Sequence, residues 1–149
     1  MTQMIFVNLP VADVERAAAF YEAIGATRDA RFSQPGQAAA MMLSETISFM
    51  LLSHDYFARF TPKPIADSHA TTGVLLCISR DSRAEVDAIV ERANAAGGKV
   101  DLRPAQDMGF MYGRTFEDLD GHIFEPMWMD VAGFEAAQQA HTRPEAEAA

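Results

Sequence analysis

The chain has 149 residues, 49% hydrophobic and 22% charged, which is the composition of a globular domain rather than a disordered or fibrous protein. Its formal net charge of -9 argues against a nucleic-acid partner, because such binding needs a basic surface. The single cysteine excludes a disulfide framework, and no secretory signal or bilayer-length apolar run is present, so we expect a cytoplasmic protein with no membrane partner.

The first part of the chain predicts a strand, a helix and three more strands. Residues 5–9 are rich in β-forming side chains and end at Pro10. Asp13 is suited to cap a helix over residues 13–24, where apolar residues recur at helical spacing before Gly25. The three strands that follow are expected at residues 27–32, 38–43 and 47–52, the last two as a hairpin.

A short helical segment is expected at residues 54–60 and is ended by the prolines of Thr61-Pro62-Lys63-Pro64. An apolar strand follows at residues 73–79. Ser82 and Glu85 have the spacing of a capping box, which predicts a helix over residues 82–96. Three more strands are expected at residues 99–102, 109–116 and 122–129, with Asp118-Leu119-Asp120-Gly121 as the turn of the last hairpin.

The two halves therefore repeat the order strand, helix, three strands. This pattern predicts an α+β fold of two tandem βαβββ modules, about 4–66 and 70–130, which form one domain over residues 1–130. Two curved sheets placed side by side would enclose a cleft suited to a ligand. The alternative is an α+β domain whose halves are alike by chance. Residues 134–140 predict a short helix, and the Ala/Glu-rich acidic tail at 143–149 is expected to fray.

Two segments at opposite ends of this pattern resemble a known family. Phe6-Val7-Asn8-Leu9-Pro10-Val11-Ala12-Asp13, with Phe20-Tyr21-Glu22 and Gly25, resembles the opening of vicinal oxygen chelate (VOC) proteins. This superfamily includes glyoxalase I, extradiol dioxygenases, and the fosfomycin and bleomycin resistance proteins. The segment 116–125, with its Asp-x-Asp-Gly turn, resembles their closing hairpin. The resemblance covers residues 4–130, is nearest to a bacterial glyoxalase- or bleomycin-resistance-like branch, and implies a homodimer. The fold hosts many chemistries and does not by itself identify one.

The resemblance also implies a metal site with one His or Glu ligand from each of four strands. The matching positions are Phe6, Met50 to within one residue, Gly73 and Glu125. Of these four residues, only Glu125 has a side chain that can coordinate a metal ion, whereas a catalytic divalent ion usually needs about three ligands from the protein. We therefore expect no metal and no cofactor. The alternative is a metal-dependent lyase or dioxygenase of the glyoxalase I type with unconventional ligands, such as Glu125, His54 and Asn8.

Glu125 and His54 are the candidate catalytic residues. Glu125 lies in an apolar strand, where a carboxylate would act as a general base or a polar anchor, or would be a structural acid bonded to Asn8, Tyr112 or Arg114. His54 follows the fourth strand and would exchange protons near neutral pH, or would simply face solvent at a helix start. His122 is expected to point out of the cleft, because strand alternation separates it from Glu125.

The candidate ligand-binding residues are Phe6, Asn8, Met50, Tyr112, Arg114 and Met127. Phe6, Met50 and Met127 would give the cleft an apolar wall. Tyr112 and Arg114 share a strand face and would orient a ligand, unless Arg114 forms an ion pair with Glu117 or Glu125. The nine methionines suit either an adaptable pocket or ordinary core filling, and Cys77 is interpreted as structural.

The sequence therefore favours a glyoxalase/bleomycin-resistance-like protein that binds or modifies a small hydrophobic molecule in an apolar, metal-free cleft. The residues leave open whether a reaction is catalysed. A non-catalytic protein that sequesters a small molecule is the other alternative.

Overall fold

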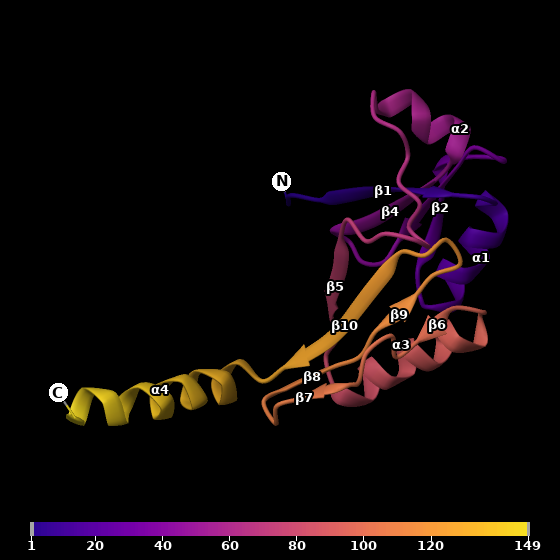
Figure 1. Ribbon diagram of the computed structural model, residues 1–149. Helices are drawn as coiled ribbons and strands as arrows, with labels where there is room; N and C mark the ends of the chain where they lie inside the picture. The colour runs from indigo at the N-terminus through magenta and orange to yellow at the C-terminus, as the bar shows by residue number, and fades with distance from the viewer. Residues whose placement is uncertain (1, 149) are drawn as a thin grey trace.

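The computed structural model describes the backbone of residues 2–148 and the side chains of residues 2–141 (Figure 1). Its first module has the predicted order of a strand, a helix and three strands. These elements are β1 (Ile5–Val11), α1 (Val14–Ala23), β2 (Thr27–Gln34), β3 (Ala38–Met42) and β4 (Ile47–Ser53). A short helix, α2 (His54–Phe57), and a 3-10 turn, η1 (Ala58–Phe60), follow.

The first sheet has the strand order β1-β4-β3-β2. β1 runs parallel to β4, with Phe6 opposite Ser48 and Asn8 opposite Met50. Helix α1 begins as predicted, because the Asp13 side chain accepts a hydrogen bond from the Arg16 backbone N–H at 3.1 Å. It packs against one face of this sheet and leaves the face of Met50 open.

The second module contains more strands than the first. They are β5 (Leu75–Ser79), β6 (Lys99–Val100), β7 (Gln106–Asp107), β8 (Met111–Gly113), β9 (Phe116–Glu117) and β10 (Ile123–Met129). Helix α3 (Arg83–Ala95) follows β5, and the Ser82 side chain caps it by accepting from the Glu85 N–H, as predicted.

The second sheet repeats the first once its interrupted strands are joined. β10 pairs with β5 in parallel and with β8 and β9 in antiparallel fashion, while β7 pairs with β8 and β6 with β9. The order β5, β10, β8/β9, β7/β6 thus corresponds to β1, β4, β3, β2. The predicted α+β fold of two tandem βαβββ modules is confirmed.

Three predicted strands of the second module differ from expectation, and the first of them, predicted at 73–79, begins only at Leu75. The strand predicted at 99–102 ends at Val100, because Asp101 adopts a left-handed backbone conformation with φ 53°. The strand predicted at 109–116 is interrupted between β8 and β9. Thr115 there accepts hydrogen bonds from the N–H groups of Asp101 and Leu102 instead of continuing the ladder. Strand β7 was not predicted.

Aromatic side chains from both modules meet in one core. Phe116 and Phe124 stack with ring centroids 5.0 Å apart, and Phe124 also meets Phe49 of the first module at 5.3 Å. Phe20 and Tyr21 of α1 complete this cluster. All five rings are buried, so the modules are joined through the faces that carry α1 and α3, and the opposite faces stay open.

The C-terminal helix α4 (Val131–Ala148) extends away from the two sheets (Figure 1). Its first turn is held by Phe134, whose ring packs on Phe110 at 5.4 Å. The helix is longer than the predicted 134–140 segment, since its backbone is helical from Val131 to Ala148. In the described part of the chain, no helix has the length and apolar character needed to cross a membrane.

Candidate functional site

The open face of the first sheet carries an apolar hollow of about 240 Å³. Strand alternation directs Phe6, Ser48 and Met50 to this face, while Phe49 and Leu51 enter the core. The main lining residues are Met4, Phe6, Phe32, Met42, Ser48 and Met50. Phe6 is 56% exposed, so a large aromatic side chain stands open to solvent at the position predicted for the apolar wall.

The rim of this apolar hollow holds one ion pair. Arg31 donates from Nε and Nη2 to the two carboxylate oxygens of Asp29, and its guanidinium lies 5.4 Å from the centre of the Phe32 ring. The hydrogen bonds from Arg31 lower the pKa of Asp29. The charges of Arg31 and Asp29 therefore neutralise each other at the rim, and the floor of the apolar hollow stays apolar.

The open face of the second sheet has its own, more polar hollow of about 130 Å³. Glu125 lies there, and its Oε2 accepts a hydrogen bond from Nη2 of Arg103 at 2.8 Å. The Glu125 side chain is 22% exposed and that of Arg103 is 37% exposed. Cys77, Met111 and Met127 also line this hollow, so Met127 is found beside Glu125.

Cys77 lies directly opposite Glu125 in the pairing of β5 with β10. Burial raises the pKa of its thiol, and the negative charge of Glu125 raises it further, against a smaller opposing effect of Arg103. The thiol is therefore protonated at neutral pH and adds no charge to the hollow.

The strand registers show which residues of the two modules are equivalent. Asn8 lies opposite Met50 in the first module, and Cys77 lies opposite Glu125 in the second, so Cys77 corresponds to Asn8. Two residues earlier on each strand, Leu75 therefore corresponds to Phe6. Gly73 lies before β5, and its assignment to the third of the four metal-ligand positions was wrong by two residues. Leu75 is no better a ligand, so the correction leaves Glu125 as the one His or Glu at these positions.

The residues present do not fit a divalent metal. Among the described residues, no three His, Cys, Asp or Glu side chains gather closely enough to hold an ion. The unconventional ligand set also separates in space, since His54 and Glu125 line different hollows. Asn8 is exposed on β1, and an amide oxygen is a poor partner for a transition metal.

His54 lies at the junction of the two modules. It starts α2 and lines a hollow of about 210 Å³ with Pro10, Asp120, His122 and the connection between the modules. His122 is buried there, its Nε2 2.9 Å from the carbonyl oxygen of Pro10, so it faces away from Glu125 as predicted. The two candidate catalytic residues are thus not brought together.

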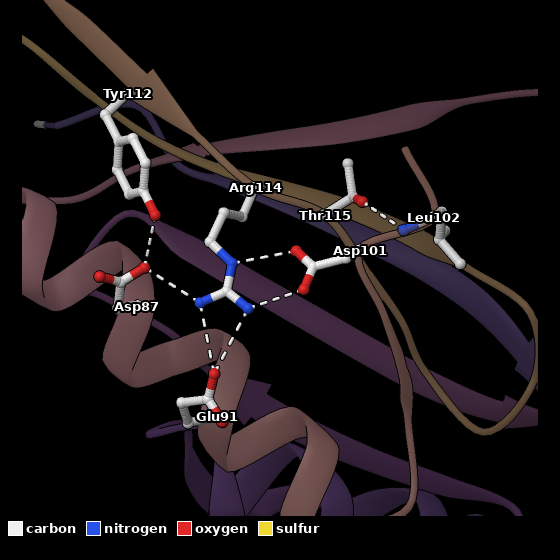
Figure 2. Close-up of polar contacts among 7 residues, drawn as sticks. All are labelled: Asp87, Glu91, Asp101, Leu102, Tyr112, Arg114 and Thr115. Carbon is white, nitrogen blue, oxygen red and sulfur yellow. Dashed lines mark hydrogen bonds and ion pairs between the residues drawn. The ribbon is translucent and has the colours of Figure 1, made fainter. Parts of the chain in front are cut away.

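Tyr112 and Arg114 lie on the helix side of the second sheet (Figure 2). The Tyr112 hydroxyl donates to Asp87 at 2.7 Å, and Arg114 donates to Asp87 at 3.0 Å and to Asp101 at 2.8 Å. Glu91 accepts from the same guanidinium at 3.3 Å. Arg114 therefore pairs with three acids other than the expected Glu117 or Glu125, and its polar groups are turned to α3 rather than to the open face.

Sequence reasoning missed Arg103 but had a signal for the position of Tyr112. In a hairpin, residues at equal distances from the turn pair with each other, and from the Asp118–Gly121 turn this rule pairs Tyr112 with Trp128. Directly paired residues have their side chains on the same face of the sheet. Glu125 lies an odd number of residues from Trp128 and so belongs to the opposite face. No comparable signal existed for Arg103, which reaches Glu125 from a loop 22 residues away.

Comparison with known proteins agrees with this geometry. The sequence-family model of the Glyoxalase/Bleomycin resistance protein/Dioxygenase superfamily matches residues 3–125 of this chain. No curated protein matches the chain. Among solved structures, a hypothetical protein from S. aureus is 26% identical, with a TM-score of 0.71 over 86% of this chain and 94% of that one.

Two further solved structures have described activities. A lactoylglutathione lyase from Agrobacterium tumefaciens is 21% identical, with a TM-score of 0.62 over 86% of this chain and 94% of that one. An antibiotic binding protein from Streptomyces is 24% identical, with a TM-score of 0.60 over 87% of this chain and 98% of that one. At these identities the likeness shows the fold alone.

Proposed function

Because the chain belongs to the Glyoxalase/Bleomycin resistance protein/Dioxygenase superfamily, we propose that it binds or modifies a small hydrophobic molecule in a largely apolar cleft. The apolar hollow on the first sheet carries this proposal. Phe6 and Met50 form its wall at positions where metal-dependent relatives are expected to hold ligands, and Phe32 and Met42 extend it. Burying roughly 150 Å² of apolar ligand surface there would contribute about 4 kcal/mol before the entropy of binding is subtracted.

The cleft of this proposal is completed by a second copy of the chain. Both open faces expose large apolar side chains, among them Phe6 and Phe32 on the first sheet and Leu75 and Met108 on the second module. Exposed apolar residues of this size are typical of a protein interface. β1 and β5 each pair with one strand in the described part of the chain, so each also leaves an open edge. In a homodimer, the apolar hollow of one copy would face Glu125 of the other.

Within this cleft, Phe6, Met50 and Met127 would contact the apolar body of the ligand, while Asn8 and Glu125 would contact its polar group. Cys77 would lie beside Glu125. The polar groups of His54 and Tyr112 face other elements, and Arg114 borders the hollow of Glu125 while its guanidinium pairs with Asp87 and Asp101.

Titration with N-phenyl-1-naphthylamine, an uncharged apolar fluorophore, tests the proposal. The wild-type chain should bind the fluorophore, and Phe6→Ala and Met50→Gln should weaken binding by at least about tenfold. Phe60→Ala is the matched control, because Phe60 is 63% exposed but lies on η1, away from the hollow. Equal binding by all four proteins, or none by the wild type, would refute an apolar ligand site here.

The oligomeric state and the fate of the ligand need separate measurements. Light scattering should give twice the chain mass of 16.3 kDa, and a monomer at all concentrations would refute the composite cleft. Since one fold serves both a lyase and an antibiotic binding protein, mass spectrometry of a bound ligand would distinguish turnover from sequestration. Chelator-sensitive activity on a hemithioacetal or catechol would instead favour the metal-dependent alternative.

A further inference from the structure

The ion pair of Arg103 and Glu125 is incomplete on both sides. One hydrogen bond, from Nη2 to Oε2 at 2.8 Å, joins the two groups. Oε1 of Glu125 accepts no hydrogen bond from any described residue, and Nη1 of Arg103 is buried without an acceptor. A guanidinium has five N–H donors and a carboxylate has room for about four hydrogen bonds, so both members keep unused capacity.

Three other arginines of the chain are used more fully, whereas Nε of Arg80 is, like Nη1 of Arg103, buried without an acceptor. Arg31 makes two side-chain hydrogen bonds to Asp29, and Arg83 makes two to Asp107. Arg114 contacts three acids. The pair of Arg103 and Glu125 thus leaves an unused donor on one member and an unused acceptor on the other. A polar group left unpaired in a partly buried site is unfavourable, and a ligand group that pairs with it recovers the lost hydrogen bond.

The surroundings of the pair favour an uncharged ligand group. Arg103 and Glu125 neutralise each other, and the neighbouring Cys77 is a neutral thiol. Met111 and Met127 supply apolar wall, while Gln106 adds an uncharged amide and Arg114, which also borders the hollow, has its guanidinium paired with three acids. A carboxylate would meet the charge of Glu125, and an ammonium group would meet that of Arg103, so either would disturb the pair.

We propose, on the basis of the function proposed above, that Arg103 and Glu125 together select a ligand whose polar end has a hydrogen bond acceptor next to a donor, as in a carboxamide or lactam. The carbonyl oxygen accepts from the Arg103 guanidinium, and the amide N–H donates to Oε1 of Glu125. Arg103 is therefore a specificity-determining residue, and the apolar body of the same molecule occupies the hollow of Phe6 and Met50.

A matched series of one-ring probes tests the assignment on the full chain. Calorimetric titration would compare benzamide, benzoate, benzylammonium and toluene near neutral pH. Wild-type protein should bind benzamide at least about tenfold more tightly than either charged probe. Similar affinity for all polar probes, or a preference for benzoate, would overturn the assignment.

Two substitutions make the test reciprocal. Arg103→Met should abolish the preference for benzamide without changing the affinity for toluene. Glu125→Gln should remove the repulsion of benzoate and raise its affinity by about tenfold. Arg92→Met, on the exposed side of α3, is the control and should keep the wild-type ranking. If no probe binds, toluene included, the proposed function itself fails. If toluene binds but the polar probes are not ranked, the role of Arg103 and Glu125 fails alone.

Discussion

The hydroxyl of Tyr21 donates a hydrogen bond of 2.7 Å to the carboxylate of Asp118, 97 residues later in the chain, and both side chains are buried. The other carboxylate oxygen of Asp118 accepts from the backbone N–H groups of Asp120 and His122, which fixes the hairpin turn. The two sequence segments that resemble the vicinal oxygen chelate proteins are therefore in contact, and their contact joins the two modules.

Tyr21→Phe tests the contribution of this contact. The substitution keeps the ring in the core but leaves one oxygen of Asp118 buried without its donor, which should destabilise the fold by about 1–3 kcal/mol. Urea unfolding followed by circular dichroism measures the loss. Tyr56→Phe is the control, since Tyr56 is partly exposed and its hydroxyl lies outside the core. Equal urea midpoints for Tyr21→Phe and Tyr56→Phe would contradict a stabilising role of the hydrogen bond between Tyr21 and Asp118.

Asp118 should also make stability depend on pH. Burial raises its pKa above the ordinary 3.8, so the folded state holds this proton more tightly than the unfolded chain. The resulting stabilisation is present below the unfolded pKa and is lost as the pH rises through the folded pKa. The stability of Asp118→Asn relative to wild type should therefore improve from about pH 4 to about pH 7. Urea midpoints at both values measure this, and a pH-independent difference would refute it.

The Arg114 cluster should show the opposite pH dependence. The hydrogen bond from Arg114 is the main cause that lowers the pKa of Asp101, and Tyr112 followed by Arg114 lowers that of Asp87. The stabilisation is thus present above the unfolded pKa of 3.8 and is lost as the pH falls through the folded values.

Arg114→Met should consequently destabilise the protein at neutral pH, by about 1–2 kcal/mol because the acids are partly exposed. The deficit should shrink as the pH falls below about 4. Binding of N-phenyl-1-naphthylamine should stay within about twofold of wild type, since Arg114 is directed to α3. Loss of probe binding in a variant of unchanged stability would instead place Arg114 in the ligand site.

Local signals in the sequence were sufficient for most of the fold. Asp13 and Ser82 cap helices where their side chains predicted it, and the Asp118–Gly121 turn fixes the register of the last hairpin. The interruption between β8 and β9 was not predictable in this way. It depends on the backbone of Asp101 and on its contact with Arg114, which are not local in sequence.

The candidate site was predicted less completely for a related reason. Alternation along single strands placed Phe6, Met50, Glu125 and Met127 on open faces, because this rule needs only the strand itself. Choosing the face of Tyr112 needed the pairing of two strands, and finding Arg103 needed the path of a loop. The assignment of Gly73 failed because the start of β5 was placed two residues too early.

Cys77 provides a last prediction, because its thiol reports the charge of Glu125 across the strand pair. Burial and the Glu125 carboxylate raise the thiol pKa above its ordinary value of about 9, so alkylation by iodoacetamide should be slow at neutral pH. Glu125→Gln removes one of the two causes and should move the midpoint of the rate–pH profile downward. Arg103→Met removes the opposing positive charge and should move the midpoint upward. Mass spectrometry of the alkylated chain measures both profiles, and midpoints that do not move would show that Glu125 and Cys77 are not electrostatically coupled.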